Sequence, residues 1–189
     1  MALRAYLRVL RERWLLLVTF VLIATGLAIV LTELTPKSYT ATAQVLVSSS
    51  SKSAATNQDN AYVLLQVTSY AKVIGSPDVI NSIRAQLHPA LSDSQIRGKL
   101  SASALSGVAI IEVHAHDGSA SRAASLANAA ADGLVAAVEK YNPSTKLFVT
   151  GPANQPSSPT SPKPLLNITL GALLGLLVGA ALAVARDIL

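Results

Sequence analysis

The chemistry that the sequence offers most directly lies in a short alternating stretch that contains Glu112, His114 and His116. Alternate side chains of a β-strand point to the same side, so this spacing could present three ligands to one metal ion. The competing interpretation is a solvated or interfacial face of a sheet, with the intervening apolar side chains in the core. We favour this second interpretation and expect no metal site, because the stretch is short and no partner ligand is visible.

The remaining polar residues form no recognisable catalytic set. Asp117 before Gly118 is typical of a turn or helix cap, and His88 before Pro89 is typical of a loop. Four more carboxylates lack the spacing that an acid, base or nucleophile set needs: Asp59, Asp78, Asp93 and Asp132. The sequence has no cysteine and no phosphate-binding GxxxxGKS/T loop. We therefore expect a protein that is not an enzyme and binds no cofactor.

Hydrophobic periodicity predicts an α/β domain around these residues. A period of two predicts strands at 39–47, 100–105, 108–116 and 146–150. A period near 3.6 predicts helices at 62–74, 79–87 and 119–141, with a short helix that begins after Ser92 and runs through Leu100. A Ser-rich loop is expected at 48–58, and Ser106-Gly107 suits a tight two-residue hairpin link. The order is that of a ferredoxin-like split βαβ sheet with helices on one face.

Two uncharged apolar runs, 14–32 and 165–185, bracket this domain. A helix needs roughly 20 residues to cross about 30 Å of hydrocarbon. A composition of 51% hydrophobic and 13% charged residues fits two such spans around one modest domain. We therefore expect transmembrane helices at 14–34 and 165–185, with the α/β domain at 35–151 between them.

The distribution of arginines predicts the orientation of these spans. Arg186 follows the second span, and four arginines precede the first: Arg4, Arg8, Arg11 and Arg13. Flanks rich in Lys and Arg tend to stay cytoplasmic and contact anionic lipid. We expect 1–13 and 186–189 on the cytoplasmic side of a membrane, and 35–151 outside. A cleaved signal peptide is the alternative, because Ala41-Thr42-Ala43 resembles a cleavage site, but the apolar run is longer than a signal's 7–15 residues.

A proline-rich segment, 152–164, joins the domain to the second span. It contains Pro152, Pro156, Pro159, Pro162 and Pro164. Proline restricts φ and removes backbone donors, so the segment is predicted to be an extended, semi-rigid strut. A plain linker or a ligand for an SH3-like groove is the alternative, and an external location argues against the groove.

The second span carries a row of glycines at four-residue intervals: Gly171, Gly175 and Gly179. These positions share one helix face and allow another helix to approach closely. The partner is either a helix of another copy or the first span of the same chain, where Ala24 and Ala28 offer a small face.

Several short patterns, in their order along the chain, resemble the polysaccharide co-polymerases, or Wzz-type chain-length determinants. They are Tyr39-Thr40-Ala41-Thr42-Ala43 after the first span, Tyr70-Ala71 ahead of Ser76-Pro77-Asp78-Val79, Ala127-Asn128-Ala129, and Ala153 before Pro156, Pro159 and Pro162. The resemblance covers nearly the whole chain. The external domain has no room for the long helical extension of larger members, so the chain is most similar to the short form of Gram-positive capsule systems.

This resemblance implies non-enzymatic control of the chain length or export of a capsule or exopolysaccharide. It implies a homo-oligomer in a bacterial plasma membrane that acts with a membrane polymerase and a cytoplasmic tyrosine autokinase, with polysaccharide itself as a candidate partner. We expect no nucleic acid as a partner. Arg186 and Asp187 are the visible charged candidates for signalling to the kinase, which is either a separate chain or fused after the second span.

Two other classes stay open. A two-span sensor whose external domain binds a ligand would share this organisation. A hydrolase of envelope assembly would need a convergent catalytic set, which the scattered carboxylates do not provide.

Overall fold

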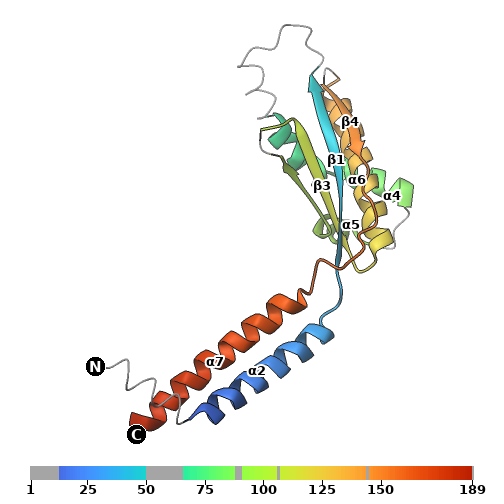
Figure 1. Cartoon of the computed structure of the whole chain (residues 1–189). Coiled ribbons are helices and arrows are strands. Elements are labelled where there is room, and N and C mark those ends of the chain that lie inside the picture. Colours follow the sequence, from blue (N-terminus) through green and yellow to red (C-terminus); the bar gives the residue numbers. More distant parts are fainter. Residues whose placement is uncertain (1–12, 50–65, 88–90, 106, 144, 189) are drawn as a thin grey trace. The chain divides into compact units, whose positions relative to one another are not determined.

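The computed structural model describes residues 13–49, 66–87, 91–105, 107–143 and 145–188 (Figure 1). The chain divides into two compact units. The helix unit comprises Met1–Lys37 and Ser161–Leu189, and the sheet unit comprises Ser38–Thr160. Most of the Ser-rich loop predicted at 48–58 and the start of the helix predicted at 62 lie outside the described residues.

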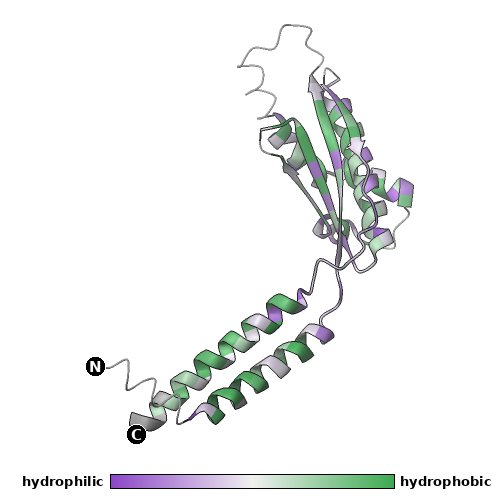
Figure 2. Ribbon diagram, viewed as in Figure 1, coloured by the Kyte–Doolittle hydropathy of each residue, from purple (hydrophilic) through white to green (hydrophobic). Residues whose placement is uncertain are grey.

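The helix unit is an antiparallel pair made of α2 (Trp14–Leu34) and α7 (Pro164–Ile188), which lie side by side (Figure 1). Figure 2 shows both helices coloured as hydrophobic along most of their length. Within the described residues, Trp14–Leu34 and Pro164–Ala183 are the helical stretches long and apolar enough to cross a membrane. The helices therefore lie where the apolar runs of the sequence predicted them.

The sheet unit contains one antiparallel sheet whose strand order is β2-β3-β1-β4. Its strands are β1 (Tyr39–Ser49), β2 (Leu100–Ala104), β3 (Ile110–Asp117) and β4 (Thr145–Gly151). β1 lies at the centre and pairs with β3 on one side and β4 on the other. The mixed helix-and-strand fold confirms the predicted α/β class, and the ferredoxin-like assignment stays a prediction.

The helices of the sheet unit pack in a layer against the strands (Figure 1). α6 (Ala120–Tyr141) packs across β1, β3 and β4, and α4 (Pro77–Leu87) packs on α6. Residues 66–71 are helical and lead into the short 3₁₀ helix η1 (Lys72–Gly75), whereas α5 (Asp93–Gly98) contacts β2. A Cβ atom added at Gly133 of α6 would lie 3.1 Å from Ser82 Cβ, so this glycine lets α4 approach closely.

The core lies between this helix layer and the sheet. β1 and β3 each bury alternate residues, and α6 buries an alanine-rich face against them. Ala41 and Ala43 are 2% and 0% exposed in the central strand. Signal-peptide cleavage at Ala41-Thr42-Ala43 would cut β1 in the middle of the sheet, so this position is poorly suited to processing.

Two local predictions were wrong. The link between β2 and β3 is longer than the predicted two residues, because the ladder ends with Leu105 N donating to Ile110 O at 2.9 Å. Gly107 adopts a φ of 80° in this longer loop, a conformation that glycine tolerates well. The short helix after Ser92 stops at Gly98, so Leu100 begins β2 instead of ending that helix. Its start is a capping box between Ser92 and Gln95.

Candidate functional site

The alternating stretch Glu112–His114–His116 lies on the open face of the sheet. The intervening Ile111 and Val113 are fully buried against the helix layer. The side chains of Glu112 and His114 are each 26% exposed, and His116 is exposed. β3 therefore has one buried apolar face and one partly exposed polar face, as the sequence predicts.

Each of these three residues is paired with a polar side chain of β1. The register places them opposite Gln44, Thr42 and Thr40, respectively. Gln44 Nε2 donates to Glu112 Oε1 at 3.3 Å, and the Oγ1 atoms of Thr42 and Thr40 lie 2.9 and 2.8 Å from the Nδ1 atoms of His114 and His116. The open face is thus a ladder of cross-strand hydrogen bonds.

The geometry of this ladder differs from that of a metal centre. Among the described residues, no group of three or more His, Cys, Asp or Glu side chains is arranged to hold a metal ion. His114 Nε2 lies 3.3 Å from Ser103 Oγ and 3.8 Å from Glu112 Oε2. The imidazole is therefore held between hydroxyl groups, with one carboxylate nearby.

The same face becomes apolar toward the other end of β1. Leu46 lies between Ile110 of β3 and Phe148 of β4 in the register of the sheet. Phe148 is 54% exposed, whereas Leu46 and Ile110 are half-buried. This apolar cluster and the polar ladder divide the open face between them.

Asp117, at the end of β3, connects neighbouring segments of the sheet unit through hydrogen bonds. Its carboxylate accepts hydrogen bonds from Lys99 Nζ at 2.9 Å and Arg122 Nε at 2.8 Å, and also from Ser119 N at 3.0 Å. Burial alone would raise the pKa of Asp117, but these three donors outweigh it and lower the pKa to about 2. The expected turn or cap role of Asp117 fits this geometry, since its bond to Ser119 N lies at the start of α6.

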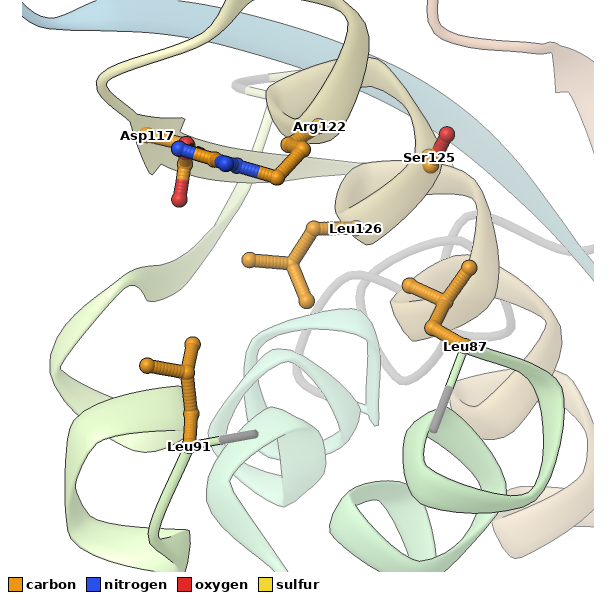
Figure 3. A pocket seen from close by; sticks show the side chains of 6 residues that line it. All are labelled: Leu87, Leu91, Asp117, Arg122, Ser125 and Leu126. Atoms are coloured by element: carbon orange, nitrogen blue, oxygen red, sulfur yellow. Dashed lines mark hydrogen bonds and ion pairs between the residues drawn. The ribbon is translucent and has the colours of Figure 1, made fainter. Parts of the chain in front are cut away.

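Asp117 and Arg122 also border a pocket of about 230 Å³ (Figure 3). Its other lining residues are Leu87, Leu91, Ser125 and Leu126. Figure 3 shows Leu91 and Leu87 on opposite sides of the view with Leu126 between them, and Asp117 beside Arg122 at one edge. The pocket is therefore mainly apolar with one charged border. His88, predicted to be a loop residue, lies outside the described residues.

A second charged cluster ties the start of α4 to the end of α6. Lys140 Nζ and Tyr141 Oη both donate to the Asp78 carboxylate, at 2.9 and 2.5 Å. The hydrogen bond from Tyr141, followed by that from Lys140, lowers the pKa of Asp78. The contact links the Ser76-Pro77-Asp78-Val79 pattern to the far end of the long helix.

The proline-rich segment is fastened to the sheet unit. Ala153 donates its N–H to Asn128 Oδ1 at 2.7 Å and accepts from Asn128 Nδ2 at 3.1 Å. Thr160 N donates to Ser38 O at 2.8 Å. Residues 152–160 therefore belong to the sheet unit, and only 161–163 lie between that unit and α7. Most of the predicted strut, 152–164, is thus attached to the sheet unit.

The glycine row of α7 faces α2 of the same chain. A Cβ atom added at Gly171 would lie 2.6 Å from Ala28 Cβ, and one added at Gly175 would lie 2.9 Å from Ala24 Cβ. Gly179 lies against Leu17 in the same way. Of the two partners considered for this face, the structure therefore shows the first span, and Asn167 Nδ2 adds a hydrogen bond to Thr32 Oγ1 at 3.1 Å.

The other predicted site residues are not brought together. Arg4, Arg8 and Arg11 lie outside the described residues, whereas Arg13 occupies the N-cap position of α2. The role of Asn128 was not predicted from the sequence, although an amide within the alanine-rich face of a long helix is a signal that could have revealed it. Thr160 carries no comparable signal in its sequence context.

Comparison with known protein families gives an indication of function that the geometry alone does not. Residues 1–87 match the model of the family described as "Wzz: Chain length determinant protein". The match covers 87 of the 189 residues, so the likeness rests on the first span, β1 and the segment through α4. No individual curated protein matches the chain. The family match supports a role in determining polysaccharide chain length, and the two apolar helices agree with a membrane location.

Proposed function

We propose that this chain is a Wzz-type polysaccharide co-polymerase that regulates the chain length or export of a cell-surface polysaccharide, either a capsule or an exopolysaccharide. The observation that carries the proposal is the family match over residues 1–87. The order along the chain supports it, because one span-length helix precedes the α/β unit and another follows it.

In this proposal the chain is a membrane scaffold and not an enzyme. Several copies assemble in the plasma membrane, with both termini in the cytoplasm and the sheet unit outside. The α2–α7 pair serves as the membrane anchor of each copy, and the sheet units position or time a membrane polymerase. The arginines before α2 support this orientation, because positively charged flanks tend to remain cytoplasmic.

We further infer a cytoplasmic tyrosine autokinase as a partner, as in the short Gram-positive form that the chain resembles. The kinase activity would reside in that partner or in a domain fused after α7. Basic residues that precede α2 would lie on the same side of the membrane as such a kinase. Co-purification of the chain from membranes with a kinase and a polymerase would test these two partners.

The test of the main proposal is the size distribution of surface polysaccharide, compared on a gel between cells lacking the protein and cells expressing it. Loss of the long fraction or a shift in the modal length would support chain-length control. An unchanged distribution would contradict it.

The pocket bordered by Asp117 and Arg122 favours a second candidate, a two-span sensor whose external unit binds a ligand. Its volume of about 230 Å³ suits a small, mainly apolar molecule. Under this alternative, narrowing the pocket with Ser125→Trp would abolish a ligand response, while the polysaccharide distribution would not depend on the protein. Ser125 is exposed, so this substitution tests the pocket without replacing a core residue.

A further inference from the structure

The segment that follows β4, residues 152–160, has few backbone groups with which to hold its position. Three of its nine residues are the prolines Pro152, Pro156 and Pro159, which lack an N–H donor. The backbone N–H groups that are bonded are those of Ala153 and Thr160, near its two ends. We call this segment the strap, because it is fastened at both ends.

The first anchor is the amide side chain of Asn128 on α6. It accepts from Ala153 N at 2.7 Å and donates to Ala153 O at 3.1 Å, so both backbone hydrogen-bonding groups of Ala153 are satisfied. Ala153 is only 7% exposed and packs into the core. The amide therefore acts on Ala153 as a neighbouring strand would, two residues beyond the end of β4.

The second anchor joins the strap to the beginning of β1. Thr160 N donates to Ser38 O at 2.8 Å, and Thr160 Oγ1 accepts from Thr40 N at 3.2 Å. Between the anchors, residues 154–159 make no hydrogen bond to the described part of the chain. The path of the strap thus depends on the two anchors.

Asn128 lowers the stability of its own helix relative to alanine, which indicates that the residue is present to hold the strap. Its neighbours Ala127 and Ala129 are buried on the alanine-rich face, and alanine is a better residue for a helix interior than asparagine. The two hydrogen bonds to Ala153 offset that cost. Closing the strap also holds Thr160, the last residue of the sheet unit, four positions before α7 begins at Pro164.

We propose that the strap is a conformational device, held closed by Asn128 and Thr160, and that its closure sets the length of the polysaccharide. Asn128 is a positioning residue in this device, because it acts through Ala153. The length readout rests on the proposed function, whereas closure itself can be measured without it.

Closure is tested by amide hydrogen exchange on the full chain in lipid nanodiscs. Asn128→Leu keeps the approximate size of the side chain and removes both hydrogen bonds. Asn128→Asp retains an acceptor but places a second oxygen against Ala153 O. We expect exchange at Ala153 to accelerate on the order of tenfold or more with Asn128→Leu, which removes the acceptor, and to a smaller extent with Asn128→Asp, which retains it, with α6 still protected in both variants. The matched controls are Asn154→Leu and Asn154→Asp, one residue along the strap, where the side chain is exposed.

The same variants are then expressed in cells that lack the native protein. We expect the modal polysaccharide length to shift with Asn128→Leu and Asn128→Asp, and to remain at the wild-type value with both Asn154 variants. Faster exchange at Ala153 without a change in length would overturn the inference, while a length change on deletion of the whole protein would still leave the proposed function standing. Unchanged exchange at Ala153 in Asn128→Leu would show that Asn128 does not hold the strap.

A second variant covers the case in which Asn128 substitutions unfold α6. Thr160→Val removes the hydroxyl acceptor at an exposed residue and leaves Thr160 N able to donate to Ser38 O. We expect faster exchange at Thr40 together with a shift in length. Wild-type length despite faster exchange at Thr40 would overturn the inference by this independent route.

Discussion

Gly175 of α7 lies directly against the backbone of Val21 in α2. A Cβ atom added to Gly175 would lie 2.8 Å from Val21 Cα and 2.7 Å from Phe20 O. Real Cβ atoms do not approach backbone atoms so closely, so no side chain fits at this position without moving the helices apart. The close pairing of α2 and α7 therefore depends on the absence of a side chain at Gly175.

The first prediction concerns this contact. Gly175→Leu is expected to destabilise the helix pair by about 1–3 kcal/mol, because the added side chain overpacks the interface. The measurement is the unfolding transition of the full chain in detergent micelles. Gly26→Leu on α2 is the matched control, since a Cβ atom there would meet nothing within 4 Å. An equal loss of stability in both variants would contradict the packing role of Gly175.

The second prediction concerns the hydrogen bond between Asn167 of α7 and Thr32 of α2. Asn167→Leu and Thr32→Val should each destabilise the pair, and the double variant should lose less than the sum of the two. Because the bond lies within an apolar helix pair, we expect a coupling free energy of about 0.6–2 kcal/mol.

A double-mutant cycle in micelles measures this coupling. Thr169→Val is the control, because Thr169 Oγ1 donates at 2.7 Å to Leu165 O of its own helix. Strict additivity of the Asn167 and Thr32 substitutions would mean that the hydrogen bond adds nothing to the pairing of the helices.

The third prediction is a pH dependence that originates at Asp117. Its pKa is lowered from 3.8 to about 2, so its contribution to stability is complete above pH 3.8 and is lost as the pH falls toward 2. The shift corresponds to about 2 kcal/mol of unfolding free energy. Asp117→Asn should remove most of this stabilisation at neutral pH. It should also reduce the decrease in unfolding free energy between pH 4 and 2.

Denaturant unfolding of the full chain at several pH values tests this assignment. Asp132→Asn makes the same change of charge at an exposed position of α6 and should leave the stability within about 0.5 kcal/mol of wild type. If the Asp117→Asn variant lost as much stability as the wild type between pH 4 and 2, the pH dependence would originate at another group.

The fourth prediction concerns the prolines of the segment 152–164. Under the proposed function, replacing Pro156, Pro159 and Pro162 together by alanine should shift the polysaccharide length, because the segment between Ala153 and α7 gains backbone freedom while Ala153 and Thr160 keep their partners. Pro143→Ala, in the exposed connection after α6, is the control. Wild-type product length in the triple variant would count against a role for stiffness in this segment.

Much of the fold could be predicted from local patterns in the sequence. Two apolar runs of spanning length determine α2 and α7, and the alternation around Val113 and Val45 determines β3 and β1. Helical periodicity and the Ser92 cap likewise place α4, α5 and α6. These features depend on residues close in sequence, and burial then selects one face of each element.

The relationships between distant residues were decided by the tertiary structure. The glycine row at Gly175 has two possible partners in sequence, and the packing of α2 against α7 selects one of them. The prolines predict a stiff segment, but its attachment depends on Asn128, which lies 25 positions before Ala153 in the chain. Contacts between such distant residues are determined by the register of the sheet and by which helix faces meet. The local periodicity of a single segment specifies neither of these.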